Sequence, residues 1–215
     1  MKKIMFNDKY GLTEAVLEGR KTQTRRMLNP TMFFQRLDTY EGWSNEDISA
    51  WKRSCNRQLY EAQGDMLQQM FDYALSSSRY KVGETVAIAQ SYADITPQVD
   101  WVKCMIRKEE IGWNNKMFVR AEDMPNHIRI TKIRIERLQD IKSEDCLKEG
   151  IWKAGNVGLE GTTYWYHGLA NSSFRTPQDA YASLIDRISG KGTWASNPYV
   201  FVYEFELIKV VLLKS

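Results

Sequence analysis

Residues 18–26 combine charged and hydroxyl-bearing side chains in a way that could do chemistry. The segment has the sequence EGRKTQTRR and holds four cations and two hydroxyls. Guanidinium groups offer planar pairs of donors and lysine offers a point charge, so the segment suits phosphates, carboxylates or a polarised carbonyl. A solvated strand edge protected by charges is the alternative. The density of hydroxyls among the charges favours a site.

A short helix is expected to orient this segment. Leu12, Ala15 and Val16 recur at helical spacing, and Gly19 follows as a typical helix stop. The polar segment therefore begins where a helix ends and a strand or loop takes over.

Length and composition indicate a globular protein with a packed core. The chain has 215 residues, of which 43% are hydrophobic, and we expect residues 1–215 to form a single domain. The net charge of +3 is only mildly basic. Overall charge therefore does not demand binding to duplex nucleic acid, and any role with nucleic acid would depend on a local patch.

Cysteine and histidine usage gives no metal-binding pattern. Cys55, Cys104 and Cys146 are widely spaced, and His127 and His167 lie apart from them. We expect a reducing compartment, no zinc site and no cofactor. No apolar run approaches the ~20 residues that span a bilayer, and the N-terminus lacks a signal-peptide core. The sequence therefore predicts a cytoplasmic protein with no membrane partner.

Residues 31–78 are predicted to form a helical insertion in an otherwise β-rich chain. Ser44 is a plausible N-cap, and Gly64 divides the helical pattern into a helix or a pair of helices. Packing of the apolar stripe back onto the domain is favoured over a groove that binds a partner. The stripe comprises Ile48, Trp51, Cys55, Leu59, Ala62, Met66 and Met70.

Three further segments have strand-like patterns. Residues 85–89 form a short apolar run typical of a buried strand, and residues 128–138 predict a long strand with a bulge near Thr131 and Lys132. Residues 199–213 predict one long strand or two. Residues 97–124, with Trp101 and Trp113, show no clear periodicity and are expected to be irregular.

A short helix is predicted from Ser143, as its cap, to Gly150. Glu149 is out of place there, because a carboxylate in the last turn opposes the helix dipole at a cost of about 0.3–1 kcal/mol if exposed. Such violations tend to mark functional positions, although an accidental surface glutamate is an equal alternative.

The C-terminal third is predicted to contain a loop and another helix. Residues 152–175 are expected to form a long ordered loop rich in glycine and aromatic residues. Thr176 and Pro177 have the pattern of a helix start, and Gly190 that of a stop. The apolar face of this helix would comprise Ala180, Tyr181, Leu184, Ile185 and Ile188.

Four ordered motifs resemble the ASCH-domain family, whose members have a PUA-like β-barrel flanked by helices. The last of them is similar to longer ASCH proteins often found in phages and prophages. The resemblance implies an α+β fold with a PUA-like barrel, extended here by the helical insertion and the extra loop. The motifs are residues 18–26, residues 80–86 (YKVGETV), residues 137–141 (RLQDI) with 148–151 (KEGI), and residues 190–194 (GKGTW) with 197–200 (NPYV).

The family includes a small bacterial amidohydrolase that removes the acetyl group from N4-acetylcytidine. Matching the motifs implies catalytic roles for Lys21, Thr24 and Glu149. Thr24 would be the nucleophile, a desolvated Lys21 would take its proton, and Glu149 would move a proton or hold the exocyclic nitrogen. Lys21 and Thr24 would point to opposite faces of a regular strand, so this assignment needs a turn or bulge between them.

Binding roles are assigned to cations and aromatics near the same motifs. Arg20, Arg25 and Arg26 belong to the basic segment, and the last two could contact phosphate. Tyr92 or Trp194 could stack on a base, although a core position is the favoured interpretation for each aromatic residue. Two further residues of the C-terminal motif complete the expected binding set, namely Lys191 and Asn197.

Two functions remain open from the sequence. One is an amidohydrolase acting on an N4-acylated cytidine or a related amide. The other is a module that binds a nucleoside, single-stranded RNA or a modified nucleotide without turnover, such as a phage accessory protein. Ribonuclease activity ranks lower, because His127 and His167 lie in no recognisable catalytic setting.

Overall fold

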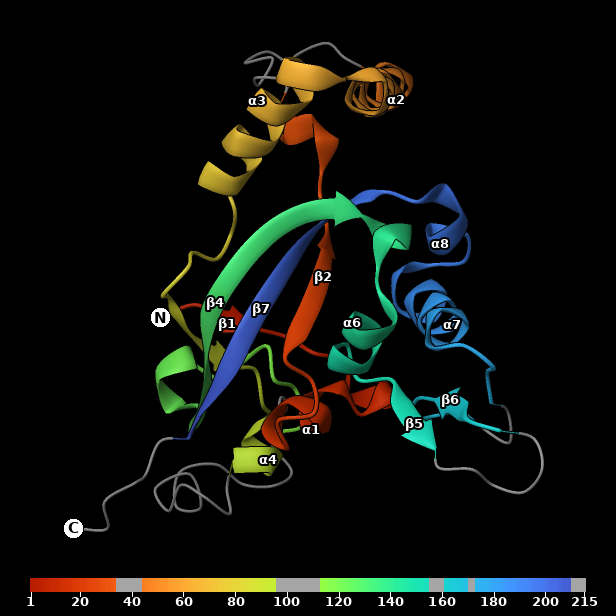
Figure 1. The fold of residues 1–215 in the computed structure, drawn as a ribbon. Helices are drawn as coiled ribbons and strands as arrows, with labels where there is room; N and C mark the ends of the chain where they lie inside the picture. The colour runs from red at the N-terminus through yellow and green to blue at the C-terminus, as the bar shows by residue number, and fades with distance from the viewer. Residues whose placement is uncertain (34–43, 96–112, 155–160, 170–172, 210–215) are drawn as a thin grey trace.

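The computed structural model describes residues 1–33, 44–95, 113–154, 161–169 and 173–209 (Figure 1). Its centre is a mixed five-stranded sheet with the order β1-β3-β4-β7-β2. Only β1 and β3 pair in parallel; the other neighbours are antiparallel. The strands are β1 (Lys3–Ile4), β2 (Gln23–Met27), β3 (Thr85–Ile88), β4 (Asn126–Arg137) and β7 (Tyr199–Lys209).

This architecture confirms the α+β class. The sheet is strongly curved, as the long arc of β4 and β7 shows (Figure 1), but the strands in the described ranges leave β1 and β2 as edges. The backbone pairing of these strands is therefore that of an open sheet and does not confirm the expected barrel.

The two long strands form as the sequence predicts. The pairing of β4 with β7 shifts between Ile130 and Lys132, which is the predicted bulge. Phe201, Tyr203 and Phe205 are all buried and alternate along β7, so they share one face. Residues 210–213, included in the predicted strand, lie outside the described residues.

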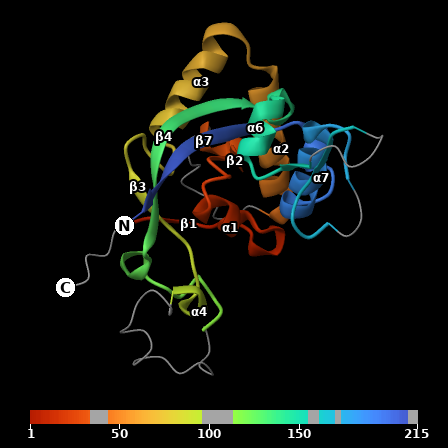
Figure 2. The same ribbon diagram turned by 60° about the horizontal axis from the view of Figure 1, so that its bottom comes forward.

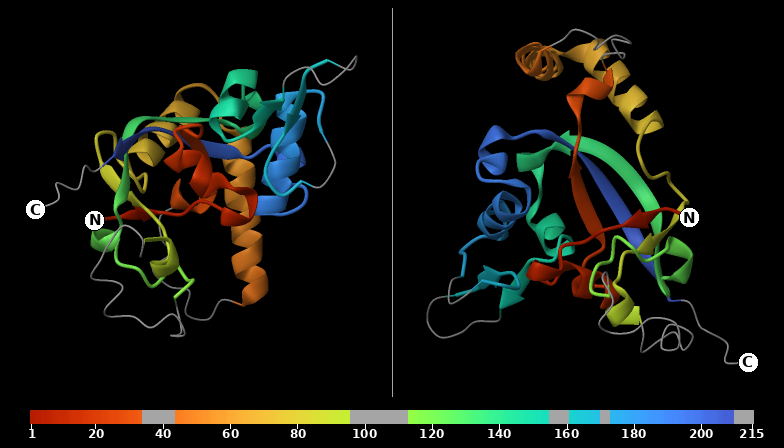
Figure 3. Two further views of the ribbon diagram at one scale, coloured as in Figure 1. Left: turned by 90° about the horizontal axis from the view of Figure 1, so that it is seen from below. Right: turned by 180° about the vertical axis from the view of Figure 1, so that it is seen from behind.

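Helices surround this sheet. Figures 2 and 3 show α1 beside the β1 end of the sheet and α7 alongside its β2 edge. The longer helices are α1 (Leu12–Leu17), α2 (Asn45–Glu61), α3 (Gly64–Ser76), α6 (Ser143–Lys148) and α7 (Pro177–Ser189). The shorter ones are η1 (Asp8–Tyr10), η2 (Pro30–Phe33), α4 (Tyr92–Ile95), η3 (Ala121–Asp123), η4 (Leu138–Asp140) and α8 (Thr193–Ser196).

The insertion is a pair of helices, as expected, and stands at one end of the sheet (Figure 1). Ser44 caps α2 in a reciprocal capping box with Asp47. The stripe packs inward through Cys55, Leu59 and Met70. Met66, by contrast, is 55% exposed.

Two local predictions are wrong. Ser143 does not cap α6, since Lys142 precedes the helix without a side-chain cap and the Ser143 hydroxyl instead accepts a hydrogen bond from Gln178. The expected 152–175 loop contains a two-stranded hairpin, β5 (Trp152–Ala154) with β6 (Thr163–Trp165). Its cross-strand pair Trp152–Trp165, with ring centroids 4.5 Å apart, supplies the packing that stabilises it.

The start of α7 is confirmed, with Thr176 accepting a hydrogen bond from the backbone of Asp179 and Pro177 in the first turn. The described apolar residues form one large cluster around the sheet and a smaller one near α4. Trp113 packs against the smaller cluster, whereas Trp101 and Cys104 lie outside the described residues. No helix in the described ranges is long and apolar enough to cross a membrane.

Candidate functional site

A cavity of about 230 Å³ lies against the edge strand β2, between α1, α6 and α7. We call it the charged cavity. Its walls combine apolar side chains of α7 with polar groups from β2 and the end of α6. The polar lining includes Lys21, Thr24, Arg25, Arg26 and Glu149.

Lys21 and Glu149 form a buried ion pair in the wall of this cavity. Lys21 Nζ donates to Glu149 Oε2 at 2.5 Å and to the Glu149 backbone oxygen at 2.9 Å. The two side chains are only 2% and 5% exposed. The residues come from opposite halves of the chain, so the fold itself creates the pair.

The local backbone explains how Lys21 and Thr24 reach the same cavity. Lys21 precedes β2, and its N–H donates to Ala15 in α1, while the N–H of Thr22 donates to Lys148 in α6. The chain therefore turns between two helices before the strand begins. The sequence assignment required a turn or bulge between Lys21 and Thr24, but the turn comprises residues 18–20, before Lys21, and the Thr22 carbonyl already pairs with Phe205 of β7. Both side chains nevertheless line the charged cavity.

Glu149 occupies the C-cap of α6, where its carboxylate opposes the helix dipole. Two cations offset this cost, because Lys21 binds one carboxylate oxygen and Arg25 binds the other. The following residue, Gly150, has φ +101°, and a Cβ there would lie 3.1 Å from Leu12 Cδ2. Glycine thus allows the sharp exit that keeps Glu149 against Lys21.

Arg25 is the centre of a larger ion network. Its guanidinium is fully buried and binds Glu149 Oε1 at 3.0 Å, Glu136 Oε1 at 2.6 Å and Asp145 Oδ2 at 3.3 Å. It also donates to the side chain of Gln23. These bonds use the donors of Arg25, so the guanidinium holds Glu149 in place. The predicted contact of Arg25 with phosphate is therefore not supported by its geometry.

Thr24 is 5% exposed and lines the charged cavity. Within the described ranges its hydroxyl makes no hydrogen bond to Lys21 or to any other side chain, unlike the neighbouring Lys21 and Arg25. Among the described residues, the buried side-chain polar atom that lacks a partner is Arg20 Nη1, so the Thr24 oxygen is not an unsatisfied buried group. Thr24 is one of the polar residues that a molecule in the cavity would meet.

Burial sets the protonation behaviour of the cavity wall. It lowers the pKa of Lys21 below 10.5, although the Glu149 carboxylate acts in the opposite direction. Burial also acts to lower the pKa of Arg25, but carboxylates led by Glu149 outweigh it and raise that pKa. Burial raises the pKa of Tyr181 well above 10. Lys21 is thus the cation here that most readily loses its proton.

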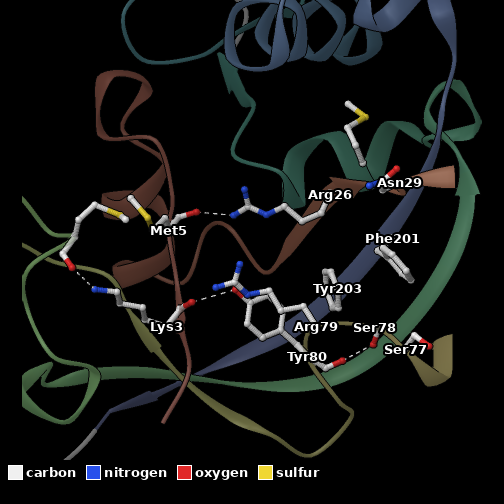
Figure 4. A pocket seen from close by; sticks show the side chains of 12 residues that line it. Lys3, Met5, Arg26, Asn29, Ser77, Ser78, Arg79, Tyr80, Phe201 and Tyr203 are labelled. Atoms are coloured by element: carbon white, nitrogen blue, oxygen red, sulfur yellow. Dashed lines mark hydrogen bonds between the residues drawn. The ribbon is translucent and has the colours of Figure 1, made fainter. Parts of the chain in front are cut away.

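A second cavity, of about 610 Å³, adjoins the first and shares Met5, Arg26 and Met27 with it. We call it the aromatic cavity. Figure 4 shows Phe201 and Tyr203 of β7 facing it, with Arg26 extending toward Met5. Arg26 donates a hydrogen bond to the Met5 backbone oxygen at 2.5 Å.

The other predicted binding residues lie apart from the two cavities. Arg20 pairs with Glu18 and lies over the Trp152 ring at 4.3 Å. Tyr92, on α4, packs against the smaller apolar cluster. Lys191 is exposed between two glycines.

Trp194 and Asn197 stabilise the turn between α7 and β7. Trp194 packs edge-on against Tyr181, with ring centroids 6.3 Å apart, and the backbone N–H of Trp194 donates to the Asp186 carboxylate. Asn197 has φ +43° and accepts a hydrogen bond from the Gln139 backbone. Both residues have structural contacts that account for their positions.

Several residues of the site do not stand out in the sequence. Tyr181 lines the charged cavity, with the Arg25 guanidinium 5.9 Å from its ring centroid, yet its pattern indicated only core. Glu136 and Asp145 bind Arg25, and no sequence pattern singles out either acid for that role.

The described residues contain no group of three or more histidine, cysteine, aspartate or glutamate side chains able to hold a metal ion. Comparison with protein-family models, curated proteins and solved structures found no match.

Proposed function

We propose that this protein is a PUA-like ASCH protein that binds a nucleoside or RNA and removes an acyl group from N4-acylated cytidine. The observation that carries the proposal is the buried Lys21–Glu149 pair, with Nζ and Oε2 2.5 Å apart, in the same cavity wall as Thr24. The strong curvature of the sheet supports the PUA-like part of the proposal (Figure 1).

The proposed reaction uses Lys21 in its neutral form. The amine takes the proton of the Thr24 hydroxyl, and Oγ attacks the acyl carbon to give an acyl-threonine ester. The N4 amine of cytidine leaves with a proton from Lys21, which Glu149 holds in place. Water then hydrolyses the ester, giving a carboxylate and restoring Thr24.

Binding without turnover is the second candidate. It is supported by the hydrogen bonds that already occupy Lys21 and both oxygens of Glu149. The hydroxyl of Thr24 makes no bond to Lys21 among the described contacts, so proton transfer requires the two groups to approach. In this alternative Thr24 donates to or accepts from the ligand, and nothing is cleaved.

Release of acetate and cytidine from N4-acetylcytidine separates the two functions. The amidohydrolase proposal expects turnover by the wild type and its loss in Lys21→Ala and in Thr24→Ala, while Thr24→Ala still binds the nucleoside. The matched control is Thr22→Ala, a half-buried threonine that lines neither cavity. Binding without acetate release would assign the second function, and full activity in Thr24→Ala would exclude Thr24 as nucleophile.

A further inference from the structure

The aromatic cavity has walls suited to a flat ring. Phe201 and Tyr203 are stacked on β7 with ring centroids 5.9 Å apart, and Tyr80 meets Tyr203 edge-on at 5.3 Å. The Tyr80 hydroxyl donates to the Lys3 backbone oxygen, so this polar atom is already satisfied. Methionines at 37% exposure (Met5) and 39% exposure (Met27) form part of the rim. The three rings are only 2–7% exposed, so they form the floor beneath the more accessible thioethers, and aromatic and thioether surfaces bind nucleobases.

The cavity is also positively charged. Its lining contains Lys3, Arg26 and Arg79 and, among the described residues, no aspartate or glutamate. Backbone oxygens hold the Lys3 ammonium. Arg79 is exposed, lies 5.6 Å from the Tyr80 ring centroid, and pairs with no carboxylate in the described ranges. This guanidinium is free to bind an anion, in contrast to the neutralised Arg25.

The two cavities meet at Arg26. Because Met5, Arg26 and Met27 line both, a single ligand can extend from one into the other. A volume of about 610 Å³ falls in the range of small-molecule sites and exceeds the 230 Å³ of the charged cavity. The arrangement of an aromatic floor beside two guanidinium groups matches the repeating base and phosphate of a nucleic-acid strand.

We propose that the aromatic cavity binds the nucleotide adjoining the modified cytidine, so that the substrate is a short single-stranded RNA rather than a free nucleoside. The inference rests on the proposed function for the charged cavity. The base of the neighbouring nucleotide lies against the β7 aromatics. Arg26 contacts the phosphodiester between the two nucleosides, and Arg79 contacts the next phosphate.

Equilibrium binding of three probes tests this assignment. The probes are N4-acetylcytidine and two trinucleotides in which N4-acetylcytidine is the 5′ or the 3′ residue and the other two are adenosines. Every protein carries Thr24→Ala so that the bound ligand is not hydrolysed. The variants compared are Arg79→Ala and the control Arg53→Ala, which removes the same charge from an exposed position on α2.

We expect at least one trinucleotide to bind about tenfold or more tightly than the nucleoside. Arg79→Ala should weaken that trinucleotide about tenfold and reduce the slope of log affinity against log salt by about 1, leaving nucleoside affinity unchanged. Arg53→Ala should change neither. Trinucleotides that bind no better than the nucleoside, or a trinucleotide affinity insensitive to Arg79→Ala, would overturn the inference and leave the proposed function standing. Failure of all three probes to bind would overturn both.

Discussion

The two adjoining cavities handle positive charge in opposite ways. In the charged cavity, Lys21 and Arg25 are buried and bound to carboxylates, and together they hold Glu149 in one position. In the aromatic cavity, Arg79 is exposed and no described carboxylate neutralises it. Cations of the first kind build and tune a site, whereas those of the second kind attract a ligand. Position in the sequence does not distinguish the two kinds. Arg25 is bound to three carboxylates, whereas its neighbour Arg26 lines the aromatic cavity.

The largest expected effect is the loss of stability on removing Glu149 from the charged cavity. Glu149→Ala leaves Lys21 and Arg25 buried without their shared carboxylate and should lower the free energy of unfolding by about 3–5 kcal/mol. The control is Glu206→Ala, which removes an exposed acid 3.6 Å from Arg129 and should cost at most about 1 kcal/mol. Denaturant unfolding measures both. Equal losses in the two variants would contradict a central role for Glu149.

Substituting Arg25 and Arg26 in turn compares a cation bound to carboxylates with one that lines the aromatic cavity. Arg25→Ala removes bonds to three carboxylates and should lower the free energy of unfolding by roughly 2–3 kcal/mol. Arg26→Ala should have a smaller effect on stability but should reduce the salt dependence of RNA binding by about one unit of slope. Denaturant unfolding and a salt titration of affinity are measured on both variants. An unchanged salt slope in Arg26→Ala would remove Arg26 from the phosphate contact.

The pH dependence of turnover tests the base assigned to the charged cavity. In the proposed reaction, Lys21 acts as the neutral amine, whose fraction rises with pH. Because burial lowers its pKa, kcat/KM should rise with pH and level off below 10.5, the ordinary lysine value. Lys21→Arg should lack activity and hence this rise. A wild-type profile that is flat across this range would argue against Lys21 as the base.

The smallest expected effect concerns Arg20, which shares the basic segment but faces neither cavity. Its contacts with Glu18 and Trp152 are partly exposed, so Arg20→Ala should cost about 0.5–1 kcal/mol of stability. Nucleoside and RNA affinities should be unchanged, as measured by the same binding titration. A clear loss of affinity would extend the site to the β5–β6 hairpin.

The sequence predicts those parts of this molecule that depend on local pattern. The helices of the insertion, the β4 bulge and the start of α7 follow from spacing, capping and turn residues. Glu149 stood out because it violates a local electrostatic rule. The β5–β6 hairpin was missed because its stability comes from a tryptophan pair across the strands, and the aromatic cavity because it joins five distant segments.

Arg26 and Met5 join the two outer margins of the sheet. Met5 follows the edge strand β1, Arg26 belongs to the edge strand β2, and one side-chain hydrogen bond to a backbone oxygen connects them. A ladder of backbone hydrogen bonds would fix the distance between these two strands. The Arg26 side chain has several rotatable bonds and does not fix that distance in the same way. Since Arg26 lines both cavities, a change in its rotamer would change the walls of both at once.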